Sequence, residues 1–440
     1  MNSHDSLSRR NFLTTAGAAG ALSGVALPAV HADDEDTVKV ALIGCGGRGT
    51  GAASQALSTK GRVKLVAMCD AFKDRLESSL NSLKTIAAKK TDGTAIVDVP
   101  EENKLVGFDG YKQAIALADV VLLCTPPGFR PLHFEEAVRQ GKHVFFEKPM
   151  AVDGPGVRRV LAAGAEAKKR GLRVGSGFCL RYCHGQRELV KRIHDGAIGD
   201  IVGMRAVYDT AGVWDPRKTR AECQSDMEYQ MRNWYYFVWL SGDQIVEQHC
   251  HSLDFINWVK QSFPVRAQGM GGRQVRTGKE YGEIYDHNFV EFEYADGTRL
   301  FSQCRHQPGT WSLTAQSLQG TKGTADTRLF DGMVIRAGKE VWRHRNNNDA
   351  DPYQLEHDTL FDAVRNNKSQ HEVEFAAYSS LTSILGRMAI YSGKMVEWEE
   401  ALNSKLDLSP KSYAWDAPPP TLPDKDGYYP IPKPGVTVAF

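Results

Sequence analysis

The sequence has 440 residues, more than one ordinary compact domain holds, so two domains are the natural expectation. Lys and Arg number 54 and Asp and Glu 53, so the charges almost cancel. Because a neutral chain without a basic run offers no electrostatic footprint for DNA or RNA, a nucleic-acid partner is not expected.

The first 32 residues have the pattern of a twin-arginine export signal. Ser8-Arg9-Arg10-Asn11-Phe12-Leu13 is followed by an uncharged run from Thr14 to Val30 and small residues near Ala32. The run is broken by Pro28 and is shorter than the roughly 18 residues that a membrane helix needs. We therefore expect residues 1–32 to be a cleaved signal peptide read by the twin-arginine translocase. The mature protein is expected in the periplasm and not as an integral membrane protein.

Short apolar runs alternate with stretches long enough for a helix over residues 38–150. The runs are VKVALIG (38–44), VKLVAMCD (63–70), DVVLLCT (119–125) and HVFFE (143–147). Near-continuous apolar strands separated by helices predict an α/β domain with a doubly wound parallel sheet. Residues 91–107 are polar and are expected to form a surface excursion.

A different pattern covers residues 151–409. A helix is expected over 153–170, and later runs such as 287–306 alternate apolar and polar residues. Asp296-Gly297 lies between two such runs and signals a hairpin. These features predict an α+β domain with an open, mainly antiparallel sheet. Residues 410–440 are rich in Pro and Tyr and are expected to form an extended arm.

A glycine-rich turn follows the first strand, with Gly44, Gly46 and Gly49 in the pattern G-x-G-x-x-G. Glycines at this spacing permit a tight turn and a close backbone approach to a pyrophosphate at a helix N-terminus. Asp70 ends the second strand 21 residues after Gly49, where a carboxylate binds the ribose hydroxyls and repels a 2′-phosphate. The sequence predicts an NAD site, with NADP as the alternative because Arg48, Lys73 and Arg75 lie nearby.

The ordered set of motifs resembles the Gfo/Idh/MocA family of oxidoreductases over roughly residues 38–400. The motifs are G-x-G-G-R-G at 44–49, Asp70, Thr125-Pro126-Pro127 followed by His133, and GKHVFFEKPMA at 141–151. The resemblance implies a Rossmann domain followed by an open-sheet domain for substrate binding and for assembly into a dimer or tetramer. It also implies the following cofactor contacts: Gly44, Gly46, Gly47, Arg48, Gly49, Asp70, Thr125, Pro126, His133, Glu147 and Lys148.

The stretch E-Q-H-C-H-S-L-D at 247–254 is compatible with two local structures. On a strand, Glu247, His249 and His251 would share a face and a metal site would be credible. On a helix, Glu247, His251 and Asp254 share a face while His249 points away. The continuation SLDFINWVKQ does not alternate, so we expect a helix over Glu247 to Trp258 and no metal site.

The family pattern G-x4-[acid]-x3-H-x2-D matches Gly242, Glu247, His251 and Asp254. His251 is then the expected general base, Glu247 orients it or holds a substrate hydroxyl, and Lys148 stabilises the developing alkoxide. Further candidate substrate contacts, with Asp254, are Arg181, Tyr182, Tyr208, Trp234, Asp286 and Arg305.

These residues predict an exported NAD-dependent dehydrogenase acting on a sugar, glycoside or polyol. The alternatives are a redox-neutral, NAD-dependent glycoside hydrolase and a non-catalytic dinucleotide-binding protein. Because the compartment outside the inner membrane has no ready pool of NAD, the cofactor is expected to be tightly held.

Overall fold

The computed structural model describes residues 37–90, 93–345 and 348–440. The predicted signal peptide at 1–32 lies outside the described residues. Across the described part of the chain, no helix is long and apolar enough to cross a membrane.

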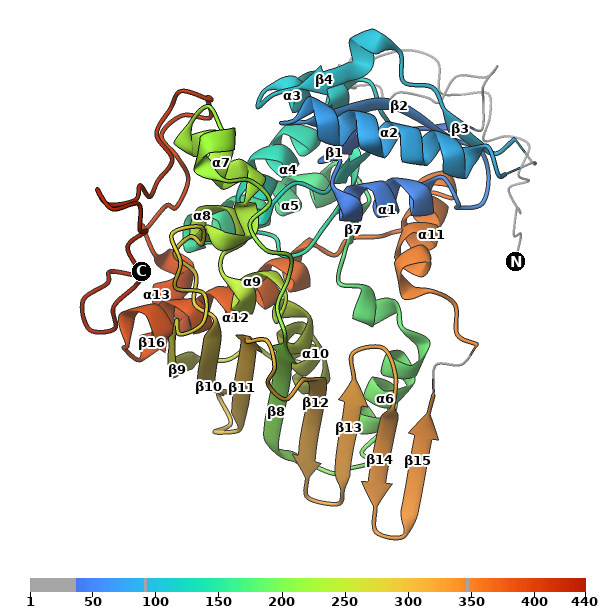
Figure 1. The fold of residues 1–440 in the computed structure, drawn as a ribbon. Helices are drawn as coiled ribbons and strands as arrows, with labels where there is room; N and C mark the ends of the chain where they lie inside the picture. Colours follow the sequence, from blue (N-terminus) through green and yellow to red (C-terminus); the bar gives the residue numbers. More distant parts are fainter. Residues whose placement is uncertain (1–36, 91–92, 346–347) are drawn as a thin grey trace, which may run out of the picture. The chain divides into compact units, whose positions relative to one another are not determined.

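The first sheet has seven strands, all parallel, and holds the glycine-rich turn at one edge (Figure 1). Its order is β3 (Ala95–Val97), β2 (Val63–Asp70), β1 (Val38–Ile43), β5 (Val120–Leu123), β6 (His143–Phe146) and β7 (Val174–Ser176), and β4 (Lys104–Val106) also pairs with β2. The predicted polar excursion at 91–107 therefore needs correction, because it contributes two short strands, β3 and β4. The sheet also takes its last strand, β7, from beyond residue 150.

Helices cover both faces of this sheet, as the continuous apolar strands predict. One face carries α1 (Gly47–Ala56), α2 (Lys73–Ala87) and α11 (Pro352–Arg365), and the other carries α3 (Gly110–Ala116), α4 (Arg130–Arg139) and α5 (Gly154–Lys169). Helix α5 begins where Asp153 accepts a hydrogen bond from the amide of Gly156 at 2.7 Å. Helix α11 comes from late in the chain, and its Leu360 and Phe361 are buried in the core of the first sheet.

The second sheet has nine strands and is antiparallel except for the β8–β11 pair. Its order is β15 (Glu340–His344), β14 (Met333–Ala337), β13 (Thr324–Arg328), β12 (Leu313–Gly320), β8 (Ile201–Thr210), β11 (Arg299–His306), β10 (His287–Glu293), β9 (Arg266–Gly272) and β16 (Val396–Glu397). Gly297 has φ +82° in the β10–β11 turn, at the predicted hairpin. The parallel sheet and the mixed, mainly antiparallel sheet confirm the predicted fold class.

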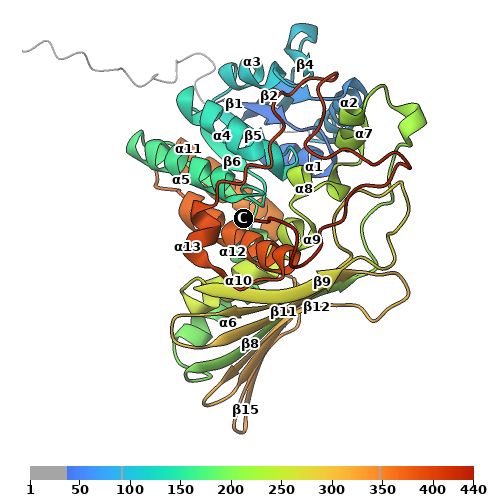
Figure 2. The same ribbon diagram turned by 90° about the vertical axis from the view of Figure 1, so that its left-hand side faces the viewer.

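Most helices of the second half lie between the two sheets or beside the second one, and α7 lies beside the helices of the first sheet (Figures 1 and 2). They are α6 (His184–His194), α7 (Asp226–Arg232), α8 (Val238–Ser241), α9 (Gln244–Glu247), α10 (Cys250–Lys260), α12 (Val373–Ser392) and α13 (Trp398–Asn403). Single 3₁₀ turns occur at Glu101–Asn103, Pro127–Phe129, Cys179–Tyr182, Arg220–Glu222 and Trp234–Tyr236. Helix α12 is buried on nearly all sides, as expected for a central helix packed against both α5 and β9.

Candidate active site

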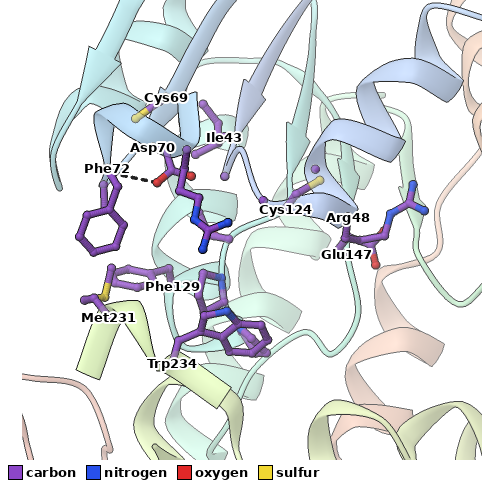
Figure 3. A pocket seen from close by; sticks show the side chains of 18 of the residues that line it. Ile43, Arg48, Cys69, Asp70, Phe72, Cys124, Phe129, Glu147, Met231 and Trp234 are labelled. Carbon is purple, nitrogen blue, oxygen red and sulfur yellow. Dashed lines mark hydrogen bonds and ion pairs between the residues drawn. The ribbon is translucent and has the colours of Figure 1, made fainter. Parts of the chain in front are cut away.

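A cavity of about 350 Å³ lies at the carboxyl ends of β1, β2, β5 and β6. Its walls come from the glycine-rich turn, from residues after β2 and β5, and from residues 214–247 of the second half. This is the edge of a doubly wound sheet at which ligands bind. Figure 3 shows Asp70 and Phe72 on one wall and Met231 and Trp234 on the facing one.

The glycine-rich turn fits a dinucleotide. Gly44 has φ +95°, and a Cβ on it would lie 2.6 Å from the carbonyl carbon of Cys124. A Cβ on Gly49 would lie 1.9 Å from the oxygen of Gly44, so neither position accepts a side chain. Gly46 and Gly47 instead have open space where a Cβ would be, at the N-terminus of α1. The turn therefore leaves a bare backbone and a helix N-terminus facing the cavity, as a pyrophosphate requires.

Asp70 marks the adenosine end of the cavity. Its carboxylate accepts hydrogen bonds from the amides of Cys45 at 2.7 Å and Phe72 at 2.9 Å. Burial raises the pKa of Asp70, while these amides and Arg75 oppose the rise. The two amides fix the carboxylate in place and leave it further lone pairs for ribose hydroxyls.

Arg48 and Glu147 form an ion pair at the cavity wall. The Arg48 Nε lies 2.8 Å from a Glu147 oxygen, and the guanidinium also stacks 4.9 Å over the Tyr353 ring. Figure 3 shows the two side chains next to each other. The pair links α1 to the end of β6 and to α11, so it fixes the loops on either side of the glycine-rich turn.

Thr125, Pro126 and His133 line the cavity after β5. The Thr125 hydroxyl lies 3.2 Å from His133 Nδ1, and the imidazole stacks between the rings of Tyr111 and Phe129. Burial, with help from Arg130, lowers the pKa of His133 to about 3, so this histidine is neutral. It supports the loop around Thr125.

Arg130 is a site residue that the sequence analysis missed. It is buried, and it donates hydrogen bonds to the carbonyls of Leu123 at 3.0 Å, Thr125 at 2.9 Å and Pro149 at 2.9 Å. It thus fastens the loop after β5 to the loop after β6. Arg130 could have been predicted from its position five residues after Thr125, because a buried arginine beside a loop needs hydrogen-bond acceptors, and the loop carbonyls provide them.

Lys148 lies at the opposite end of the cavity from Asp70. Its Nζ donates to the carboxylate of Glu247 at 2.9 Å and to the main-chain carbonyl of Glu247 at 2.6 Å. Burial alone would lower the pKa of Lys148, but the charge and hydrogen bond of Glu247, together with Cys250 and Glu147, outweigh burial and the pKa is raised. Lys148 is therefore a fixed positive charge, and its peptide bond to Pro149 is cis.

The predicted continuous helix over Glu247 to Trp258 is wrong in one respect, since α9 ends at Glu247 and α10 begins at Cys250. The Glu247 carbonyl accepts from Lys148 and not from the amide four residues later. The amide of His251 instead reaches the Gln248 carbonyl at 3.3 Å. The lysine takes the carbonyl that would have continued the helix, which explains the break.

His251 and His249 still point in different directions, as the helix prediction requires. His251 packs edge-on against Phe178, and burial followed by the charge of Lys148 lowers its pKa well below the usual value. Its Nδ1 has no hydrogen-bond partner among the described residues. His249 is fully buried on the sheet side, with Nε2 2.8 Å from the Ser302 hydroxyl. The two imidazoles therefore have separate surroundings, His251 beside Phe178 and His249 beside Ser302.

The other expected substrate contacts divide into three groups. Trp234 lines the cavity, and Tyr208 lies within electrostatic reach of Lys148 and Glu247. Arg181 and Asp254 form a two-pronged ion pair with contacts of 2.8–3.2 Å. Trp234 is the one of these four that lines the cavity, whereas Tyr208, Arg181, Asp254 and also His251 lie outside its wall.

Three of the expected substrate contacts instead bind other residues outside the cavity. Tyr182 donates to Glu372 at 2.6 Å. Asp286 is fully buried and accepts from the amides of residues 274–276 at 2.7–3.1 Å, so it shapes that loop. Arg305 lies on the outer face of the second sheet, 3.7 Å from Asp209. None of the three lines the cavity.

Further residues of the cavity wall were not predicted either. Most are aromatic or cationic side chains whose neighbours lie far away in the sequence: Phe72, Phe108, Phe129, Trp214, Arg217, Met231 and Arg232. No local pattern separates such side chains from ordinary core aromatics.

Two family models match the chain. One, described as "Oxidoreductase family, NAD-binding Rossmann fold", matches residues 38–178, and the "GFO/IDH/MocA C-terminal domain" matches residues 186–326. The parallel sheet, the bare glycine turn and the acid after β2 thus belong to an NAD-dependent oxidoreductase. Because the two models together span more than half of the sequence, the chain belongs to the Gfo/Idh/MocA family.

The names of several relatives describe enzymes that act on polyols and sugars. The chain is 26% identical over 277 residues to inositol 2-dehydrogenase of Pseudomonas fluorescens, covering 61% of this chain and 69% of that protein. An aldose–aldose oxidoreductase from Caulobacter crescentus, solved with glycerol, superposes with a TM-score of 0.64 at 18% identity, covering 82% and 99% of the two chains. Levoglucosan dehydrogenase, solved with NADH and levoglucosan, gives 0.63 at 15% identity with the same coverage. At such identities the two solved structures show a shared fold.

Proposed function

We propose that this protein transfers hydride between a hydroxyl-bearing carbon of a sugar, glycoside or polyol and an NAD that stays bound. The observation that carries the proposal is the contact between Lys148 and Glu247 at the end of the cavity opposite Asp70. A dinucleotide with its adenosine ribose at Asp70 would extend toward Lys148. The reacting hydroxyl then belongs between Lys148 and His251.

The charges at this end suit removal of a hydroxyl proton. His251 is neutral, because burial and Lys148 disfavour the imidazolium, so its imidazole can accept a proton. Lys148 stays protonated and can donate to the oxygen as negative charge develops on it. NAD, when bound, supplies the acceptor for the hydride. Glu247 holds the ammonium in position and offers a carboxylate to a neighbouring hydroxyl.

The lining of the cavity supports a carbohydrate substrate. Trp214 and Trp234 line the cavity together with the polar groups of Arg217 and Glu247. Flat aromatic faces combined with a few placed polar groups are the usual lining of a small-molecule site. The names of the inositol, aldose and levoglucosan relatives agree with this substrate class.

A redox-neutral glycoside hydrolase is the second candidate. It would use the same residues to oxidise a sugar carbon transiently, eliminate the aglycone, add water across the resulting double bond and return the hydride. Arg232 of the cavity wall forms an ion pair with Asp74 on α2, which joins the two walls beside the Asp70 end, and a cofactor held there would be regenerated in place as this cycle requires. A dehydrogenase could also regenerate its bound cofactor in place by reducing a second sugar, as the name aldose–aldose oxidoreductase implies for that relative.

One experiment separates the two candidates. The purified protein is incubated with a panel of glycosides and free sugars while the fluorescence of bound NADH and the release of aglycone are followed. Stoichiometric NADH formation without aglycone release indicates a dehydrogenase, and catalytic aglycone release without net NADH indicates a hydrolase. Absence of both signals with every glycoside and free sugar of the panel contradicts the proposal.

Export and assembly complete the proposal. We infer that residues 1–32 direct twin-arginine export of the folded holoprotein, and replacing both Arg9 and Arg10 with Lys should then hold it in the cytoplasm.

We also infer a homo-oligomer through the outer face of the second sheet, where Met270, Phe289 and Phe301 are exposed. Replacing these three side chains with Ser or Asp should produce monomers by light scattering, and an unchanged mass would exclude this face.

A further inference from the structure

The last part of the chain, residues 404–440, runs over the outside of the second half without forming a helix or strand. Its path lies beside α7 and α8 in both views (Figures 1 and 2). Hydrogen bonds hold it at both ends: the Leu408 amide donates to Asp153 at 2.8 Å, and the Gly435 amide donates to the Ser392 carbonyl at 2.7 Å. We call residues 404–440 the C-terminal arm.

The arm supports the wall of the cavity at the adenosine end. The Trp415 ring lies 4.6 Å from Phe108 and 5.3 Å from Phe72, and the Tyr413 ring lies 5.3 Å from Phe129. Phe72, Phe108 and Phe129 all line the cavity. Phe72 follows Asp70 by two residues, so these rings are the neighbours of whatever binds beyond the ribose.

The arm also supports the facing wall, which is the C-terminal end of α7. Met231 and Arg232 of this helix line the cavity. The side-chain amide of Gln230 donates to the Thr421 carbonyl at 2.6 Å and to the Tyr429 hydroxyl at 3.4 Å. Helix α7 is therefore held from outside by the second stretch of the arm.

The two walls meet across the adenosine end. The Arg232 guanidinium lies 3.6 Å over the Phe72 ring and bonds to Asp74 on α2 at 2.8 Å. Figure 3 shows Phe72 and Met231 at the same end of the cavity. Opening this end requires α7 to move away from Phe72, and the arm is attached to both sides of that gap.

We propose that the C-terminal arm is a clasp that holds the adenosine end of the cofactor closed, so that NAD exchanges only when the arm lets α7 and Phe72 separate. The inference rests on the dinucleotide assignment of the cavity. It adds Tyr413 and Trp415 to the residues that control the cofactor, although neither lines the cavity. It also gives a structural cause for the retention that an exported enzyme needs.

The test measures nucleotide exchange and not turnover. The holoprotein is loaded with NAD, mixed with isotope-labelled NAD, and the bound nucleotide is analysed by mass spectrometry over time. W415A removes the ring that packs against Phe72 and Phe108. D74N removes the charge of the exposed carboxylate that pairs with Arg232. Y428A is the matched control, because Tyr428 is an exposed ring of the same arm whose one ring contact is with Lys279 among the described residues.

We expect slow exchange in the wild type and in Y428A, and exchange at least about tenfold faster in W415A, the size that two lost aromatic pairs produce. D74N should accelerate exchange less, since its carboxylate is largely exposed. Exchange at the wild-type rate in both W415A and D74N overturns the clasp while the dinucleotide assignment stands. A wild type that binds no NAD overturns that assignment and the clasp with it. D74N keeps the test decisive if W415A does not fold.

Discussion

Replacing His251 with Ala tests the catalytic centre most directly, because the neighbouring His249 is a built-in control. A positioned acid–base group contributes roughly 10²–10⁴-fold to a rate, which is about 2.7–5.4 kcal/mol in the barrier. His251 makes no hydrogen bond through Nδ1 to any described residue, so its loss breaks no bond at that atom. We therefore expect H251A to lose turnover by that factor and to keep its cofactor.

His249→Ala should behave in the opposite way. Its Nε2 bonds to the Ser302 hydroxyl at 2.8 Å in a fully buried setting. Removing the imidazole leaves that hydroxyl without its partner, which costs about 1–3 kcal/mol of folding free energy. Burial holds the pKa of His249 at about 3, so it carries no proton for the reaction near neutral pH. We expect H249A to be less stable but to retain most of its turnover.

The assay combines two measurements on each variant. Single-turnover reduction of the bound nicotinamide reports the chemical step, and urea unfolding reports the free energy of unfolding. Nucleotide content after gel filtration controls for cofactor loss. Equal loss of turnover in H251A and H249A, with added zinc raising the turnover of the wild type and of neither variant, would refute this reasoning, because the H-x-H pair would then bind a metal.

Three further predictions follow from other parts of the site and the core. Lys148→Ala should lose turnover as H251A does, and Lys148→Arg should not restore it, because a bulky planar guanidinium cannot occupy the place of the compact ammonium that bonds to Glu247; full activity of the Arg variant in steady-state assays would contradict this. Gly49→Ala should abolish NAD binding in calorimetry or unfold the first domain, since its Cβ would lie 1.9 Å from the oxygen of Gly44, and ordinary NAD affinity would show that the turn is not rigid. Burial raises the pKa of Glu283 from 4.5 to about 7, so its protonated form stabilises the fold below pH 4.5 and this contribution disappears as the pH rises through 7. Over that window the wild type should lose up to about 3 kcal/mol of unfolding free energy relative to Glu283→Gln, and parallel pH profiles of the two proteins would exclude the effect.

The sequence by itself determined the local elements and the cofactor site. The alternation of apolar runs and helices fixes the parallel sheet, since both signals depend on residues a few positions apart. The glycine-rich turn and Asp70 belong to one β–α–β unit, so their meeting at one edge of the sheet follows from its topology. The different directions of the His251 and His249 side chains could also be predicted from the sequence, because they depend on the local helical period.

Only the tertiary structure decided which distant residues complete the site. Lys148 and Glu247 are 99 residues apart, and their contact depends on how the second half packs against the strand ends. That contact also breaks the predicted helix, because a lysine from elsewhere takes the Glu247 carbonyl. Trp415 meets Phe72 across a still longer separation, through an arm that has no regular period of its own. Such contacts are set by the packing of whole elements, and a local sequence pattern does not record that packing.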